Sequence, residues 1–382
     1  MRKSIFIFLA IICNSIICAQ EIKNVTIDSK ELNQQRDILI YTPQGYNELT
    51  LQKYDVIYVF DAQNRDLFDL THSIITFLES NRMFIVVGIT SPYNATLSYS
   101  RQNDFKPALI NPINPDNANV GQKGNADNFM NYIKNEVISY VEKNYRTNSR
   151  RIAIGHSLGA SFILYSFVKD AAIFDDYIAV SPNLAYDHER LADELIKFDY
   201  KNLVKEKFLY ISNADEGTTY YEEWKPAREK VYSFFKTYEF PDIKYVVKDF
   251  SDYGHWESFL PSLQAALKAY FPFVDEQESK YSIEKMYEIT ISVKVSDKND
   301  EVFITGNQPA LGDWQPDKIQ LKRKSDFLRE IKLKVYAPAV FKFTRGNWDT
   351  EGVIKWHAAS NIFIDPSKQN YFEYEIENWA DK

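Results

Sequence analysis

The sequence has 382 residues, of which 45% are hydrophobic and 26% are charged. That length suits one large domain with a smaller one, and the composition excludes a disordered or fibrous protein because it supplies both an apolar core and a polar surface. The formal net charge is −8, and an acidic surface argues against nucleic acid as a partner.

The first twenty residues differ from the rest of the chain. Arg2 and Lys3 precede an apolar run, Ile5 to Cys13, and Ile17-Cys18-Ala19 offers a cleavage site. This order is typical of a secretory signal peptide, and the run is too short to span a bilayer comfortably. We expect residues 1–19 to be a signal peptide. The mature chain, with a net charge of −10, would be exported to the periplasm or the extracellular space, and no later run predicts a transmembrane segment.

Both cysteines of the sequence, Cys13 and Cys18, lie in this segment. The mature chain would therefore form no disulfide and carry out no thiol chemistry. Acylation of Cys18 would make the protein a lipoprotein, but Ile17 stands where a small side chain is expected. We favour a protein without a lipid anchor.

Motifs typical of metal and cofactor sites are missing from the sequence. It has no H-E-x-x-H, no pair of histidines at ligand spacing and no Gly-rich phosphate-binding loop. We expect neither a metal nor a cofactor, and the sequence does not indicate the oligomeric state.

Strand-like and helix-like runs alternate from residue 20 to residue 274. Several strand-like runs are nearly continuous in Val and Ile, which is typical of strands buried on both faces of a parallel sheet. In 128–145, apolar residues recur every four positions, as on one face of a helix, and 258–270 shows the same pattern. This alternation predicts an α/β fold with a mostly parallel sheet and helices on both faces. The expected strands are 36–42, 54–61, 83–89, 151–154, 177–180, 207–212 and 243–250.

The composition and the pattern of apolar residues change near residue 275. Residues 275–284 are polar and charged, and we expect them to be a linker. Beyond them, 287–295 alternates apolar and polar residues, and short runs of this kind are separated by Gly, Asn, Asp and Pro. This pattern predicts a small all-β sandwich domain over 285–382.

The motif Gly155-His156-Ser157-Leu158-Gly159 follows one of the expected strands and precedes a helical run. A serine on such a turn is held above the edge of the sheet, and the two glycines prevent steric clashes in the tight bend. The following helix N-terminus also favours negative charge. This context predicts that Ser157 is a nucleophile.

A nucleophilic serine needs a base, and His255 is the candidate. It lies in the loop between the last strand and the last helix of the α/β region, where the histidine of an α/β-hydrolase is found. The other four histidines suit structural or solvent-exposed positions better: His72, His156, His188 and His357.

The acid of such a triad follows a strand between the serine and the histidine in the chain. The run FLYISNADEG (208–217) leads directly into Asp215 and Glu216. We favour Asp215 over Glu216 as the residue that orients the imidazole, with Asp249 or Asp252 as further alternatives.

Acyl transfer also needs hydrogen-bond donors for the oxyanion, each worth about 3–4 kcal/mol of transition-state stabilisation. The backbone N–H of Leu158 is the first candidate. The second donor usually comes from the turn after an early strand, which here is Asp61-Ala62-Gln63, so we expect the N–H of Ala62 to serve.

Several blocks of the α/β region together resemble the putative esterase family, which includes enterobactin esterases, esterase D, feruloyl and acetylxylan esterases and mycolyltransferases. The resemblance implies an α/β-hydrolase fold, with Ser157 as nucleophile, His255 as base and an acid after the penultimate strand. Where the family commonly has Asp-Gly, this chain has Asp61-Ala62. The blocks include VIYVFDAQN (56–64), RQNDFKP (101–107), IAIGHSLGASF (152–162) and GHWESF (254–259).

The C-terminal region resembles the family 20 starch-binding type of carbohydrate-binding module, in the blocks 301–321 and 340–353. Such modules stack sugar rings on exposed tryptophans, because indole offers a broad apolar face. The resemblance makes Trp348 and Trp356 the candidates for carbohydrate binding, whereas Trp314 suits a packing role.

These features predict an exported serine carboxylic-ester hydrolase that forms an acyl-enzyme. The substrate would be a carbohydrate-linked ester, acetyl or feruloyl, or a siderophore lactone. An acyltransferase acting on a sugar acceptor would use the same triad. A non-catalytic, surface glycan-binding protein would use the α/β domain only as a scaffold, and reactivity of Ser157 distinguishes it from the enzymes.

Overall fold

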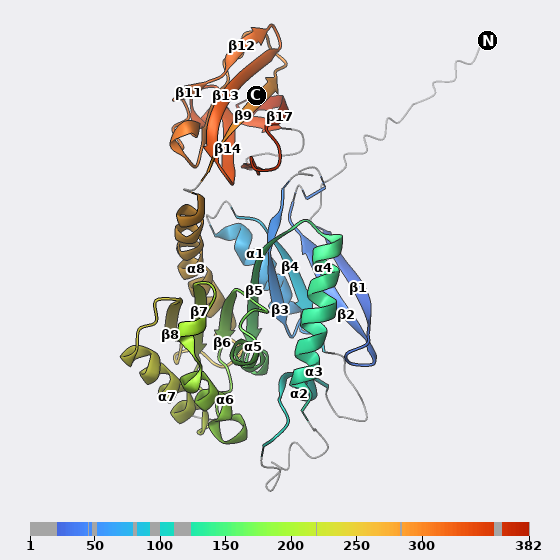
Figure 1. The fold of residues 1–382 in the computed structure, drawn as a ribbon, viewed down its shortest axis with the longest axis vertical. Coiled ribbons are helices and arrows are strands. Elements are labelled where there is room, and N and C mark those ends of the chain that lie inside the picture. Colours follow the sequence, from blue (N-terminus) through green and yellow to red (C-terminus); the bar gives the residue numbers. More distant parts are fainter. Residues whose placement is uncertain are drawn as a thin grey trace, which may run out of the picture.

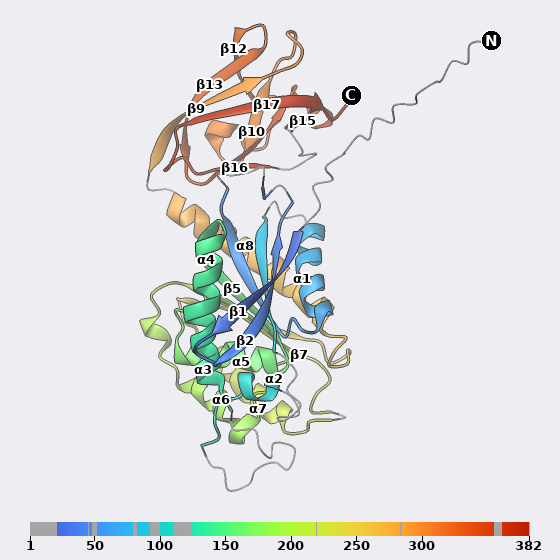
Figure 2. The same cartoon turned by 90° about the vertical axis from the view of Figure 1, so that its right-hand side faces the viewer.

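The computed structural model describes residues 21–44, 46–47, 52–78, 82–91, 100–110, 124–218, 220–282, 285–354 and 361–381. The expected signal peptide and Trp356 lie outside these ranges. The described chain forms an α/β region followed by a β-rich domain, which lies beyond the C-terminal end of helix α8 (Figures 1 and 2). None of the helices in these ranges is both long and apolar enough to cross a membrane.

An eight-stranded sheet forms the centre of the α/β region, in the order β1-β2-β4-β3-β5-β6-β7-β8. β1 and β2 are antiparallel to their neighbours, and the strands from β4 to β8 pair in parallel. The expected fold class is therefore confirmed. The strands are β1 (Glu21–Ser29), β2 (Gln34–Thr42), β3 (Tyr54–Phe60), β4 (Phe84–Ile89), β5 (Thr147–His156), β6 (Asp176–Val180), β7 (Lys207–Asn213) and β8 (Ile243–Asp249).

Helices cover both faces of this sheet, and its central strands β3, β4 and β6 are buried along their whole length. All seven residues of β3 are buried. Val56 and Tyr58 belong to the core on one face, whereas Ile57 and Val59 belong to the core on the other. Figure 2 shows α4 and α1 on opposite sides of the sheet. Burial on two faces explains why the strands read as continuous apolar runs.

The helices of the α/β region divide between the two cores. Residues of α1 and α8 belong to one core, and residues of α3 to α7 belong to the other. The helix expected at 128–145 is continuous helix with a π-helical segment, η3 (Tyr132–Val137), between α3 and α4. The helices are α1 (Arg65–Phe77), α2 (Ser100–Phe105), α3 (Ala126–Asn131), α4 (Ile138–Asn144), α5 (Leu158–Lys169), α6 (Tyr186–Lys197), α7 (Trp224–Thr237) and α8 (Phe259–Ser282).

The segment 275–284, which we expected to be a linker, is helical as far as Ser282, where α8 ends. Arg82 anchors this part of the helix, because its guanidinium pairs with Asp275 and Glu278 at 2.6 Å each. The two carboxylates are three residues apart and therefore lie on one face of the helix. The polar composition of this segment did not indicate its helical structure.

The C-terminal domain consists of two sheets, as expected for a β-sandwich. A four-stranded sheet has the order β11-β10-β14-β16, and a five-stranded sheet has the order β12-β13-β9-β17-β15. Apolar residues from both sheets form one core. The strands are β9 (Met286–Lys294), β10 (Phe303–Gly306), β11 (Ile319–Gln320), β12 (Lys322–Ser325), β13 (Leu328–Tyr336), β14 (Ala339–Thr344), β15 (Gly352–Ile354), β16 (Ile362–Ile364) and β17 (Tyr371–Trp379).

Candidate active site

Ser157 occupies the turn between β5 and α5. Its backbone has φ 56° and ψ −121°, a conformation that residues other than glycine rarely adopt. Its N–H donates a hydrogen bond to the carbonyl oxygen of Val180, at the end of β6, at 2.9 Å. The strained turn therefore holds a half-buried serine at the carboxyl edge of the sheet, as in a nucleophile elbow.

The two glycines of the motif allow β5 and α5 to approach each other closely. A Cβ atom on Gly155 would lie 2.5 Å from the backbone of Gly159. A Cβ atom on Gly159 would lie 3.0 Å from a carboxylate oxygen of Asp61. The motif therefore needs glycine at position 155, whereas a side chain at position 159 would have to displace the Asp61 carboxylate slightly.

His255 lies in the loop between β8 and α8 and is held by its backbone as well as by its side chain. Its N–H donates to the hydroxyl of Tyr220 at 3.0 Å, and its carbonyl oxygen accepts a hydrogen bond from Nε2 of His156 at 2.8 Å. The imidazole rings of His156 and His255 are 4.6 Å apart. Because His156 directly precedes Ser157, these contacts bring His255 to the elbow.

Glu216 is the carboxylate that contacts the His255 ring, through a hydrogen bond between its Oε1 and Nδ1 of His255. Its Oε2 accepts a hydrogen bond from the N–H of Ala214 at 2.8 Å. Burial by itself would raise the pKa of Glu216, but the hydrogen bonds from His255 and Ala214 and the charge of His255 outweigh it and lower the pKa. An ionised Glu216 fixes the tautomer in which Nε2 of His255 can accept a proton.

Asp215 does not contact the imidazole, so our preference for it over Glu216 is corrected by this geometry. Its carboxylate accepts a hydrogen bond from the hydroxyl of Tyr220. The same hydroxyl accepts a hydrogen bond from the N–H of His255. Asp215 therefore supports the loop of His255 from the backbone side. Asp249, another alternative, accepts hydrogen bonds from the Asn213 side chain and the N–H of Ser251.

The N–H of Ala62 does not point toward a vacant oxyanion position, because it donates to the carbonyl oxygen of Ile89 at 2.9 Å. The expectation for Ala62 is therefore wrong for this structure: the end of β4 already uses that donor. Leu158 is the first residue of α5, so its N–H has no partner within the helix. It stays the candidate for the first oxyanion donor.

Arg101 is a site residue that the sequence analysis did not single out. Its guanidinium forms two hydrogen bonds with the carboxylate of Asp61, at 2.5 and 2.7 Å, and Asp61 lies against Gly159 of the elbow. The side chain of Gln63 also donates to Asp61, at 2.8 Å. Arg101 is close enough for its charge to lower the pKa of His156, after the larger effects of burial and of His255. It belongs to the block RQNDFKP, but neither its spacing nor its type indicated a place near Ser157.

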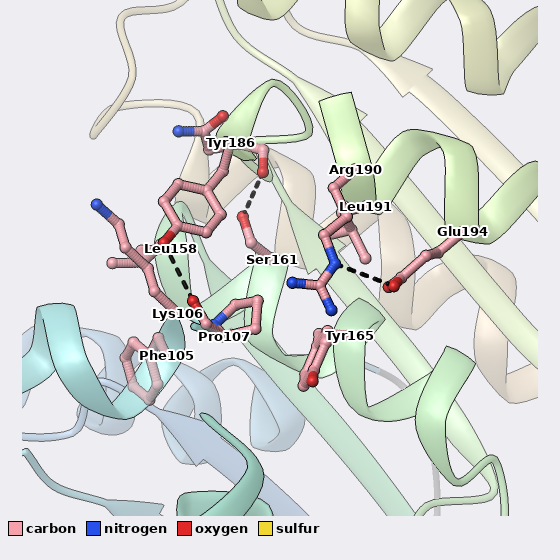
Figure 3. A pocket seen from close by; sticks show the side chains of 11 residues that line it. Phe105, Lys106, Pro107, Leu158, Ser161, Tyr165, Tyr186, Arg190, Leu191 and Glu194 are labelled. Atoms are coloured by element: carbon pink, nitrogen blue, oxygen red, sulfur yellow. Dashed lines mark hydrogen bonds and ion pairs between the residues drawn. The ribbon is translucent and has the colours of Figure 1, made fainter. Parts of the chain in front are cut away.

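A narrow pocket opens beside the elbow. Leu158 and Ser161, from the start of α5, line one side of it, and Phe105, at the end of α2, and Pro107 line another (Figure 3). Tyr186 closes another side, where its hydroxyl donates to the carbonyl oxygen of Pro107 at 3.1 Å. The pocket is therefore placed to hold a group attached to the carbonyl that Ser157 would attack.

The other candidates lie away from this site or outside the described chain. In the described ranges, no three His, Cys, Asp or Glu side chains are grouped so that they could hold a metal ion. Trp348, in the short helix η6 (Trp348–Thr350) of the C-terminal domain, is 46% exposed. Trp356 is not in the described ranges.

A family model with the description "Putative esterase" matches residues 29–282, about two thirds of the chain. The chain belongs to the putative esterase family. A second model, described as a starch binding domain, matches residues 286–371. Both resemblances stated from the sequence are thereby confirmed.

Two curated relatives match part of the α/β region. One is the ferri-bacillibactin esterase BesA of Bacillus subtilis, 27% identical over 125 residues. The other is the siderophore enterobactin esterase of Emericella nidulans, 29% identical over 122 residues. The matches cover 31% and 30% of this chain, and 43% and 40% of the lengths of these relatives.

Solved structures show the same fold at low sequence identity. An IroE-like serine hydrolase from Shewanella oneidensis aligns over 66% of this chain and 80% of its own, with a TM-score of 0.57 and 22% identity. The siderophore hydrolase EstA from Aspergillus nidulans aligns over 68% and 95%, with a TM-score of 0.54 and 18% identity. These similarities support the α/β-hydrolase architecture.

The contact between Glu216 and His255 predicts unequal effects of removing the two neighbouring carboxylates. Glu216→Gln would leave the imidazole with the wrong tautomer and lower kcat for p-nitrophenyl acetate by about 10³–10⁴. Asp215→Asn keeps an oxygen that can accept the Tyr220 hydroxyl, so kcat would stay within about tenfold. A larger loss in Asp215→Asn than in Glu216→Gln would contradict this assignment.

His156 predicts a loss of stability in acid. Burial, reinforced by the charge of His255, lowers its pKa to about 3. In the unfolded chain this histidine takes up a proton as the pH falls below about 6.5, whereas the folded protein stays unprotonated there until about pH 3. The free energy of unfolding should therefore fall between these pH values, by up to about 1.4 kcal/mol per pH unit from this group.

The measurement is the melting temperature of the wild type and of His156→Asn between pH 6.5 and 4. The variant should lose stability less steeply as the pH falls, and His188→Asn, which removes an exposed histidine, is the control. Equal slopes in His156→Asn and the wild type would show that His156 does not resist protonation in the folded protein.

Proposed function

We propose that this protein is an exported serine carboxylic-ester hydrolase in which Ser157, His255 and Glu216 form the catalytic triad. The observation that carries the proposal is the hydrogen bond from Nδ1 of His255 to the buried Glu216, beside a serine on a strained strand-to-helix turn. These groups occur in the chain order serine, acid, histidine that is typical of α/β-hydrolases. The family match supports the same activity.

In the first half of the reaction, Oγ of Ser157 attacks the ester carbonyl and Nε2 of His255 takes its proton. Glu216, hydrogen-bonded to Nδ1, stabilises the imidazolium that forms. The N–H of Leu158 donates to the oxyanion. The imidazolium then protonates the departing alcohol, which leaves Ser157 acylated.

In the second half, water replaces the alcohol. Nε2 of His255 takes a proton from the water as its oxygen attacks the acyl carbon, and then returns the proton to Oγ of Ser157. The products are a carboxylic acid and free enzyme. Among the described residues, none makes a hydrogen bond to Oγ of Ser157, so the serine and the histidine would close on each other when substrate binds.

Two features of the chain support two classes of substrate. The curated relatives are named as esterases of bacillibactin and enterobactin siderophores, which supports a siderophore lactone. The starch-binding match over 286–371 supports an ester on a carbohydrate, acetyl or feruloyl. We propose both classes as candidates for the natural substrate.

The nucleophile is tested with the mature protein and the Ser157→Ala variant. The wild type should hydrolyse p-nitrophenyl acetate and react with a fluorophosphonate at Ser157. Ser157→Ala should lose the labelling and at least about 10⁴ of kcat, because no other group can form the acyl-enzyme. Ser161→Ala, one turn along the same helix, is the control and should keep labelling. Hydrolysis by Ser157→Ala at the wild-type rate would refute the proposed mechanism.

The C-terminal domain is tested by binding to an insoluble glucan. The exposed indole of Trp348 offers a stacking face, so Trp348→Ala should weaken binding by about tenfold, as loss of a stacked aromatic ring does. Phe327→Ala removes an exposed ring of the same domain and serves as the control. Equal binding by the wild type and Trp348→Ala would remove Trp348 from the carbohydrate site.

A further inference from the structure

Exposed apolar side chains gather in the loops around His255. Tyr221 and Tyr253 are both exposed, Trp256 is 61% exposed, and Leu260 follows in the first turn of α8. A cluster of exposed apolar side chains on a water-soluble surface often marks a binding site. Here the cluster adjoins the proposed base, His255.

Trp256 packs on a buried ring although most of its surface is exposed. Its indole lies 4.9 Å from the imidazole of His156, with the ring planes tilted by 39°. His156 is itself 1% exposed, and its Nε2–H is fixed on the carbonyl oxygen of His255. Because the ring beneath it is immobilised, Trp256 can present an apolar face with little loss of conformational entropy on binding.

A second exposed ring belongs to the same surface. Tyr221 stacks on Trp224 at 4.7 Å, with an interplanar angle of 14°. Trp224 in turn lies edge-on to His255 at 5.6 Å, and Trp256 lies edge-on to His255 at 6.0 Å. We call Tyr221, Trp224 and Trp256 the aromatic rim. Its members all connect to the imidazole of His255 through ring contacts.

The position of the aromatic rim indicates which half of an ester it would meet. His255 must deliver its proton to the departing alcohol oxygen, so the alcohol lies on the side of His255. The pocket lined by Leu158, Ser161 and Tyr165 extends along α5 instead. It is therefore suited to the acyl group, whereas the rim is suited to the alcohol.

We propose that the aromatic rim binds a flat ring carried by the alcohol portion of the substrate, and that Trp256 determines this specificity. The inference rests on the proposed ester hydrolysis. It states the substrate class as esters whose alcohol carries a ring. An arene and the C–H face of a pyranose share the chemistry that an indole face recognises. A phenolic alcohol and a sugar are thus the two sources of such a ring.

The test uses acetate esters, because a common acyl-enzyme leaves only the alcohol to differ. We compare ethyl acetate, 2-naphthyl acetate and methyl 6-O-acetyl-glucoside. Trp256→Ala should lower kcat/KM by about tenfold for at least one ring-bearing ester and by less than about twofold for ethyl acetate. Trp256→Phe should restore most of the loss. Tyr238→Ala, which removes a ring of similar exposure at the end of α7, should change none of the three.

The outcomes also separate the two sources of the ring. A loss confined to the naphthyl ester assigns the rim to an arene, and a loss confined to the glucoside assigns it to a sugar. An equal loss for ethyl acetate would overturn the proposal. So would a selective loss for methyl 2-naphthoate, in which the ring belongs to the acyl group.

A binding measurement keeps this inference separate from the proposed catalysis. Calorimetry would measure 2-naphthol and methyl glucoside binding to Ser157→Ala and to Ser157→Ala/Trp256→Ala. Weaker binding by the double variant supports binding at the aromatic rim, whether or not the wild type is active. A wild type that neither hydrolyses esters nor reacts with a fluorophosphonate would contradict only the proposed function. Equal binding by the two variants, or no binding to Ser157→Ala, would overturn the rim.

Discussion

The hydrogen bond between Glu216 and Nδ1 of His255 depends on the parallel pairing of β7 with β8. Because the two strands run in the same direction, the segments that follow them leave the sheet at one edge. Glu216 follows β7 and His255 follows β8, so the register of the sheet brings an acid and a histidine together across 39 residues of chain. The elbow after β5 emerges at the same edge, which is where ligands bind in open α/β sheets.

Two layers of polar contacts hold these groups in place. On one side of His255, the Tyr220 hydroxyl joins its N–H to the carboxylate of Asp215. On the other side, the buried His156 donates to its carbonyl oxygen. The imidazole is therefore fixed by its backbone as well as by Glu216, and such support is what keeps a catalytic side chain within reach of its productive geometry.

The sequence predicted the α/β fold and the β-rich domain because both depend on local periodicity. It could not distinguish Asp215 from Glu216, because the two residues are adjacent in a turn. A turn has no repeating pattern from which the orientation of each side chain could be predicted. Two other differences arise from contacts between distant parts of the chain. The N–H of Ala62 donates to Ile89, at the end of a different strand, and Arg82 pairs with Asp275 in the helical segment 275–282. Arg101 was missed for the same reason: its relation to Asp61 exists only in three dimensions.

The length of α8 has a consequence for any cooperation between the two domains. The helix begins four residues after His255 and continues for 24 residues, or about 36 Å at 1.5 Å per residue. The β-rich domain starts where it ends (Figure 1). Under the proposed function, a short glycan bound to the C-terminal domain would not reach along the length of this helix. A long polymer held by the C-terminal domain would instead raise the local concentration of esters near Ser157, as a tether does.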